Sequence, residues 1–182
     1  VVEEKVEELL AAPDSAPALD NAKLDAANED ANLELWFNHA YINNPAEDIT
    51  STGWNAYQLR LAKNESEGTH MFLLSKEGHN GLTVSVTPFK NADGVELGTE
   101  LMYGYYFDDV DGKTLVDPIP WVKDGQTFDL AAGRSYMYII KATSYLDTPA
   151  GIYTATVTVK DASGNEIKKA TVSAYVWNFA LP

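Results

Sequence analysis

The sequence predicts an all-β protein, an antiparallel β-sandwich of the immunoglobulin-like or jelly-roll-like kind. From residue 31 onward, apolar and polar residues alternate with the period of two that is typical of strands. The alternating segments are separated by Asn-Gly, Asp-Gly and Ser-Gly pairs, which favour turns. No segment after Pro13 has the periodicity of a helix of four turns. We therefore expect one sandwich domain over residues 31–182, preceded by a tail at residues 1–30.

The tail differs from the rest of the chain in composition. Its apolar residues approximate one helical face, which Pro13 would end; these residues are Val2, Val6, Leu9 and Leu10. The stretch that follows is rich in Ala, Asp, Asn and Pro. Two interpretations stay open. The tail is either a short helix with a linker or a disordered extension with no role in the fold.

Four later segments carry the strand pattern. Three alternate strictly, with the predicted core sets Tyr57, Leu59 and Leu61; Leu82, Val84 and Val86; and Tyr153, Ala155, Val157 and Val159. The fourth, RSYMYIIKA, is apolar and rich in β-forming residues. This pattern indicates antiparallel sheets with one buried and one solvated face. Turns are expected at Asn80-Gly81, Asp93-Gly94, Asp111-Gly112, Asp124-Gly125 and Ser163-Gly164, where Gly accepts a positive φ.

Composition excludes several classes of function. The net charge of -14 argues against nucleic acid and anionic membrane surfaces as partners. The chain has no cysteine, which rules out disulfides, zinc–thiolate sites and a cysteine nucleophile. No apolar run approaches the roughly 18–20 residues that span a bilayer, so no membrane insertion is expected.

The last strand is expected to place aromatic rings on its outer face. In ATVSAYVWNFALP, the small side chains of Val172, Ala174 and Val176 share the predicted core face. The opposite face begins polar and ends with Tyr175, Trp177 and Phe179. Such an apolar patch on a soluble domain favours either a covering neighbour or a bend that buries both faces.

The closing hairpin resembles the β-sandwich that precedes the catalytic barrel in glycoside hydrolase family 123. The family's Pro-x-Gly-x-Tyr stretch is matched by Pro149, Gly151 and Tyr153, and its final Val-Trp-x-Phe-x-Leu-Pro by Val176, Trp177, Phe179, Leu181 and Pro182. Two further segments, LRLAKNESEGTHMFLLS and VDPIPWVKDGQTFDLAAGRSYMYIIKA, are similar as well. The sequence departs at Ala155 and Asn178, where the family has Gly and Asp. The resemblance covers residues 33–182.

The resemblance implies a non-catalytic accessory domain of a secreted bacterial enzyme. In the family the Leu-Pro pair marks the junction with the barrel, and the barrel carries the acidic pair for hydrolysis. We therefore expect the downstream catalytic domain of the same chain as the partner, no enzymatic activity in these residues and a secreted or cell-surface location.

Two groups of carboxylates invite a chemical interpretation. Glu65 and Glu67 have the spacing of paired glycosidase acids, but with Asn64 they are expected to form a structural turn. Asp108, Asp109 and Asp111 are a weak calcium candidate, although the spacing does not fit an EF-hand and a solvated turn is favoured. No other cofactor is expected.

The three histidines show no metal-ligand spacing; they are His39, His70 and His79. We expect none of them to ligate a metal.

Exposed aromatic residues are the candidates for carbohydrate contact. Trp54 and Trp121 follow loop-like segments, and Trp36 is a third candidate. In YGYYF, the alternating Tyr103, Tyr105 and Phe107 are interpreted as core. Three hypotheses therefore stand, since the fold alone cannot separate them. The domain supports a hydrolase barrel, binds carbohydrate by itself, or serves in cell-surface adhesion or scaffolding.

Overall fold

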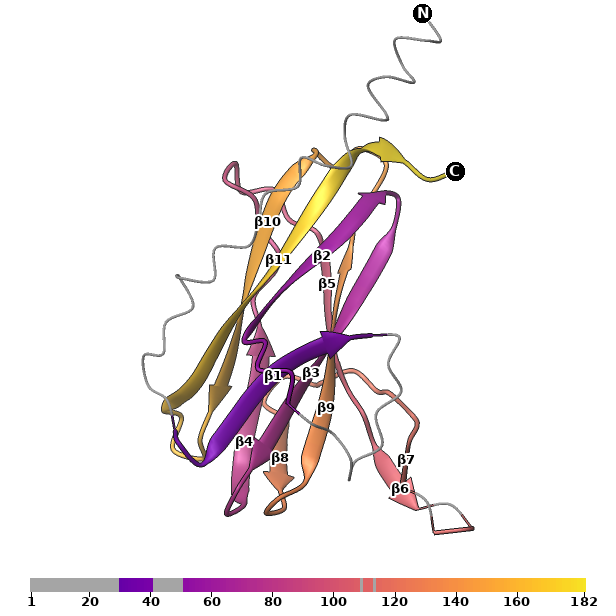
Figure 1. The fold of residues 1–182 in the computed structure, drawn as a ribbon. Coiled ribbons are helices and arrows are strands. Elements are labelled where there is room, and N and C mark those ends of the chain that lie inside the picture. Colours follow the sequence, from indigo (N-terminus) through magenta and orange to yellow (C-terminus); the bar gives the residue numbers. More distant parts are fainter. Residues whose placement is uncertain (1–29, 41–50, 109, 113) are drawn as a thin grey trace, which may run out of the picture.

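The structure, a computed structural model, describes residues 30–40, 51–108, 110–112 and 114–182. These residues form an all-β protein in which two sheets pack against each other, and the described part of the chain contains no helix (Figure 1). The tail predicted at residues 1–30 lies outside the described residues except for Asp30. No helix capable of spanning a membrane is found in the part of the chain that the structure describes.

The smaller main sheet has four strands, all antiparallel to their neighbours. In spatial order they are β1 (Leu33–His39), β3 (Ser66–Ser75), β9 (Ser135–Thr143) and β5 (Gly98–Tyr103). Strands β3 and β9 occupy the centre and contribute Met71, Leu73, Tyr138 and Ile140 to the core.

The larger sheet has five strands and one departure from the predicted antiparallel order. In spatial order they are β2 (Ala56–Lys63), β11 (Glu166–Ala180), β10 (Gly151–Lys160), β4 (His79–Val86) and β8 (Thr127–Leu130). Strand β2 pairs parallel to β11, whereas the other pairs are antiparallel. The prediction of antiparallel pairing throughout was therefore wrong for β2, because an alternating pattern does not specify the direction of a neighbour.

The alternation predicted for the strands is confirmed by burial. On β10, Tyr153, Ala155, Val157 and Val159 are all buried in the main core cluster. Val172, Ala174 and Val176 of β11 are buried in the same cluster, and so are Leu59 and Leu61 of β2. The inner faces of the two sheets therefore share one hydrophobic core, as in a β-sandwich.

Four of the five predicted turns are confirmed, and one was wrong. Gly94, Gly112, Gly125 and Gly164 each lie in or directly after a turn, and all four have a positive φ. Asn80-Gly81, in contrast, lies inside β4, where the pairing with β8 shifts register between His79 and Leu82. Gly81 has a φ of 70°, so this pair introduces a bulge instead of joining two strands.

A third, two-stranded sheet extends from the body of the domain. It consists of β6 (Tyr106–Asp108) and β7 (Thr114–Val116) (Figure 1). Backbone hydrogen bonds continue the pairing toward the main sheet, from Tyr105 N to Pro118 O and from Tyr103 N to Pro120 O. The chain that continues from β7 therefore runs along β5 and adds an outer edge to the four-stranded sheet.

Candidate functional site

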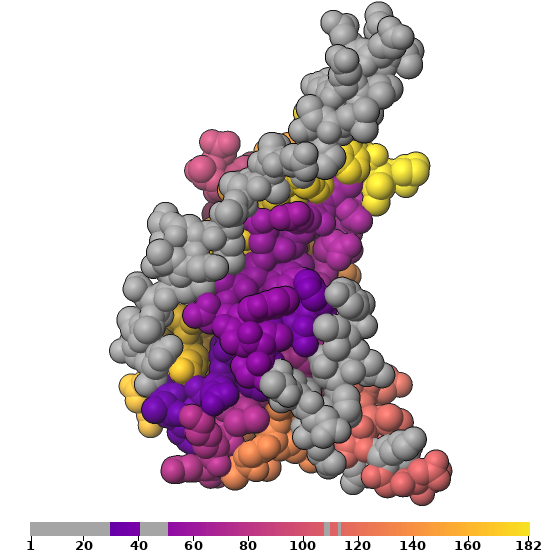
Figure 2. Space-filling model, viewed as in Figure 1, coloured from indigo at the N-terminus to yellow at the C-terminus, as the bar shows by residue number. Residues whose placement is uncertain are grey.

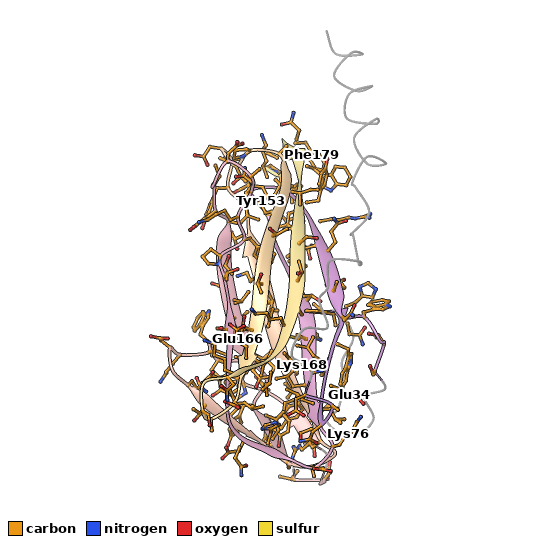
Figure 3. The ribbon with its side chains drawn as sticks, turned by 90° about the vertical axis from the view of Figure 1, so that its left-hand side faces the viewer. Glu34, Lys76, Tyr153, Glu166, Lys168 and Phe179 are labelled. Atoms are coloured by element: carbon orange, nitrogen blue, oxygen red, sulfur yellow. The ribbon has the colours of Figure 1, made fainter. Side chains whose placement is uncertain are left out.

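The outer face of β11 carries aromatic residues at its C-terminal end. Tyr175 and Trp177 are partly exposed and lie edge to face, with 4.7 Å between ring centroids. Phe179 is also partly exposed and lies at one end of the strand, whereas Glu166 and Lys168 lie toward the other (Figure 3). The strand thus changes from charged residues at its N-terminal end to aromatic residues at its C-terminal end.

Neighbouring residues enlarge this aromatic end. Ile152 of β10 is opposite Tyr175 in the ladder and is 42% exposed. Leu181 is exposed as well, and its backbone N–H donates to the carbonyl of Lys63 at 2.9 Å. We call the set of Ile152, Tyr175, Trp177, Phe179 and Leu181 the β11 patch. Arg60, which pairs with Tyr175 from β2, is exposed and borders it.

A hollow of about 500 Å³ lies at one open side of the sandwich, between β4 and β5. Trp121 is at this hollow and is 64% exposed. Its backbone forms a bridge to Met102 of β5. The turn that follows closes with two hydrogen bonds between Lys123 and Gln126, from Gln126 N to the Lys123 carbonyl and from Lys123 N to Gln126 Oε1, both 3.0 Å. We call it the Trp121 hollow.

A second hollow, of about 460 Å³, lies at the opposite open side, where β1, β2 and β3 meet. Tyr57, Arg60 and Glu67 are among its lining residues. The Tyr57 hydroxyl lies 2.5 Å from Nδ1 of His39, which also lines the hollow. Trp54 is 44% exposed, and its ring contacts the ring of His39 with 5.2 Å between centroids. This hollow therefore adjoins an aromatic cluster whose rings contact one another.

The prediction that Trp36 could contact carbohydrate was wrong. The side chain is only 1% exposed and stacks on Phe72 with 5.5 Å between centroids. Together with Met137 the two rings form a second, smaller buried cluster. Trp36 is therefore a core residue, because the packing around β1 and β3 encloses its ring.

The interpretation of the YGYYF aromatics as core was also wrong in part. Tyr103 packs against the main core, but Tyr105 and Phe107 are exposed. They belong to the hairpin that extends from the domain, together with exposed Val110 and Leu115. Figure 2 shows the residues around this hairpin standing out at one corner of the surface. Alternation failed here because β6 leaves the sandwich and, among the described residues, no second sheet covers it.

Asn64, Glu65 and Glu67 form the β2–β3 connection and its flank. Asn64 has a φ of 63°, the left-handed conformation that a turn requires. The Glu65 carboxylate accepts a hydrogen bond from the backbone N–H of Ala62 at 2.5 Å. Partial desolvation raises the pKa of Glu67, and the nearby charge of Glu65 raises this pKa further. The Glu65 carboxylate is thus engaged in holding the turn.

The described residues contain no group of three or more acids or histidines that could hold a metal ion. Within the calcium candidate, Asp111 is exposed, whereas Asp109 and the side chain of Asp108 lie outside the described part of the chain. His79 contacts Asp30, with 2.7 Å between Nε2 and Oδ2. That bond supplies the largest of the effects that lower the pKa of Asp30.

Some residues of these surfaces were not identified from the sequence. The alternation in β10 implied that Ile152 points outward. It did not predict the register of the ladder, which places Ile152 opposite Tyr175. The polar rim of the Trp121 hollow comes from β4, β5 and the loop before β8. Only tertiary packing brings these segments together.

Comparison with known proteins defines the class of fold. No family model matches the sequence, and no curated protein matches it. Among solved structures, a family 123 glycoside hydrolase from Clostridium perfringens aligns with 82% of this chain at 11% identity and a TM-score of 0.63. The chain spans 28% of that enzyme's length. At this identity the similarity shows a shared β-fold with one part of a larger protein.

Two other solved structures are similar at lower scores. The CooA pilin subunit from enterotoxigenic Escherichia coli aligns with 81% of this chain at 10% identity and a TM-score of 0.43. The alignment includes 99% of the pilin subunit. The fimbrial subunit MyfA from Yersinia enterocolitica, in complex with galactose, aligns with 80% of this chain at 14% identity and a TM-score of 0.36. The alignment includes 98% of MyfA.

Proposed function

We propose that this chain is a non-catalytic β-sandwich domain that packs against the catalytic domain of a glycoside hydrolase and supports it. The contact surface is the β11 patch. The proposal assigns no catalysis to these residues and places the parent protein in the secreted or cell-surface fraction of a bacterium. Its support is the patch itself together with the fold similarity to part of a family 123 enzyme.

The observation that carries the proposal is the pair Tyr175 and Trp177 on the outer face of β11. Tyr175 and Trp177 cannot be buried in the core of the sandwich, because Ala174 and Val176 occupy the inward-facing positions of this strand. Their rings, with exposed Ile152, gather apolar surface at one end of an outer sheet face. Aromatic residues on such a face are typical of the fully buried centre of a protein interface.

The carboxylates of the described residues fit a supporting role better than hydrolysis. Glu65 accepts from a backbone N–H, so its carboxylate is occupied within the turn. Glu67 lines the hollow beside Trp54, but a second acid opposite it is not among the described lining residues. A glycosidase needs two carboxyl groups across the scissile bond.

Hydroxyl-radical footprinting tests the proposal. The product of the whole gene and the 182-residue chain are labelled in parallel, and oxidation of each tryptophan is measured by mass spectrometry. We expect Trp177 to be protected in the longer product, with Trp54 and Trp121 labelled equally in both. Equal labelling of Trp177, or a gene that encodes nothing beyond Pro182, would overturn the proposal.

A further inference from the structure

We propose that the Trp121 hollow binds a neutral pyranose unit of a glycan, which stacks on the indole ring and hydrogen-bonds to the polar rim. The β11 patch belongs to other strands, so this site does not depend on the function proposed above.

Trp121 is exposed and lies on an ordered segment of backbone. Backbone hydrogen bonds flank it on both sides, from Tyr103 N to Pro120 O at 3.0 Å and from Val122 N to Leu101 O at 2.9 Å. No ring of the described residues packs against the indole, and the side chain is 64% exposed. An ordered backbone beneath the ring lowers the entropy cost of binding a ligand, because that segment need not be ordered on binding. The C–H face of a pyranose ring is an apolar surface suited to such a ring.

The rim supplies donors and acceptors for sugar hydroxyls. Lys123 and Lys160 are donors, and Glu100 and Asp124 are acceptors. The hollow has a volume of about 500 Å³, which lies within the range of small-molecule sites. One or two sugar units therefore fit the space, with apolar and polar groups on different sides.

The charges of the rim favour a neutral ligand. Among the lining residues the two acids, Glu100 and Asp124, balance the two lysines, Lys123 and Lys160, and Glu100 is also paired with Lys141 at 2.9 Å. The rim is thus close to neutral on a chain whose net charge is -14. An anionic sugar would be repelled by the negative charge of the whole protein, and a cationic sugar would be repelled by the two rim lysines. A neutral sugar avoids both costs.

A peptide is the alternative occupant, and the structure disfavours it. Strand β4 pairs with β10 over Thr83–Val86, but its pairing with β8 ends at Thr83. The edge from Val84 to Val86 has no strand partner on that side among the described residues, so an extended peptide could add there. Three residues are few compared with ordinary strands of about 5–6. The ladder would therefore be short, and the exposed indole would lie outside it.

Trp54 provides a matched control. It is also an exposed tryptophan beside a hollow, at the opposite open side of the sandwich. Its ring, however, contacts the rings of His39 and Tyr57. Replacing it removes a similar amount of exposed aromatic surface without touching the Trp121 hollow.

The test is a titration of the 182-residue chain with defined glycans. Neutral oligosaccharides of glucose, galactose, xylose and N-acetylglucosamine, and one that bears N-acetylgalactosamine, are screened on an array and then measured by calorimetry. We expect at least one to bind. Trp121→Ala should weaken binding by about tenfold or more, while Trp54→Ala should leave the affinity within about twofold. Circular dichroism confirms that both variants keep the fold.

Three outcomes would overturn the inference. The first is that no glycan of the panel binds the native chain. The second is that Trp121→Ala binds as well as the native chain. The third is that an array of extended peptides yields binders that depend on Trp121 while the glycans do not. Footprinting of Trp177 is independent of all three, so failure here leaves the proposed function standing.

Discussion

Ile152 lies directly opposite Tyr175 in the ladder between β10 and β11, and both side chains point away from the core. One β-branched and one aromatic side chain therefore meet on an outer sheet face. Such cross-strand pairs stabilise a sheet by roughly 0.2–1 kcal/mol, so they contribute little to the fold compared with a core residue. Within β10, exposed Ile152 and buried Val157 lie on opposite faces of the sheet. The difference in their contribution to stability can be measured by substitution.

Two substitutions in β10 should differ sharply in cost. Ile152→Thr keeps a β-branched residue at an exposed position, so we expect the free energy of unfolding to change by about 0.5 kcal/mol or less. Val157→Ala removes fully buried methyl groups, and we expect a loss of about 2 kcal/mol. Urea unfolding of the two variants beside the native chain gives both values. Similar losses in both would contradict the assignment of Ile152 to the surface.

The carboxylate of Glu65 should matter for stability, whereas that of Glu67 should not. Glu65→Ala leaves the backbone N–H of buried Ala62 without its acceptor, and we expect a loss of about 2 kcal/mol in the free energy of unfolding. Glu65→Gln keeps an acceptor oxygen and should recover part of that loss. Glu67→Ala, at an exposed position, is the control and should cost about 0.5 kcal/mol or less. Chemical denaturation checks all three.

Asn64 should tolerate glycine but not a β-branched residue. Its φ of 63° is the left-handed conformation, which glycine adopts freely and a branched side chain adopts only with strain. We expect Asn64→Gly to change the free energy of unfolding by a few tenths of a kcal/mol, and Asn64→Val to lower it by about 1–2 kcal/mol. Thermal melts measure the difference. Equal melting temperatures for the two variants would refute the turn geometry.

The contact between Asp30 and His79 should make stability depend on pH in the acid range. Several hydrogen bonds, above all that to His79, hold the pKa of Asp30 below its ordinary value of 3.8. A carboxyl whose pKa is lower in the folded state stabilises the fold above its unfolded pKa. That contribution is lost as the pH falls through the folded pKa.

Asp30→Asn isolates this contribution. We expect the variant to be less stable than the native chain at pH 6 and the gap to shrink as the pH falls below about 4. Unfolding curves at a series of pH values give the gap directly. A gap that stays constant down to about pH 2 would show that the ionised carboxylate contributes nothing.

Trp36 and Trp54 should differ in the cost of truncation. Trp36 is buried against Phe72, and Trp36→Ala should lower the free energy of unfolding by about 3–5 kcal/mol. Trp54→Ala removes a half-exposed ring and should cost far less. Equilibrium unfolding followed by far-ultraviolet circular dichroism compares them. If Trp36→Ala were as stable as Trp54→Ala, the smaller core cluster would not be a core.

The failures of sequence-based prediction are specific. Trp36 resembles Trp54 and Trp121 as a residue type, and its burial follows only from the pairing of β1 with β3. Tyr105 and Phe107 alternate like core residues, yet they are exposed on a hairpin that no second sheet of the described part of the chain covers. Asn80-Gly81 has the composition of a turn but occupies a bulge. In each case the decisive partner is distant in the sequence.

The sequence by itself determined the local properties of this protein. The alternation in β10 and β11 specifies which side chains share a face, because successive residues of a strand point to opposite sides. Glycines such as Gly164 mark most turns for an equally local reason. The tertiary structure alone decided the parallel pairing of β2 with β11, the position of Ile152 beside Tyr175 and the hollow at Trp121. These depend on register and on the packing of distant strands, and a pattern of period two encodes neither.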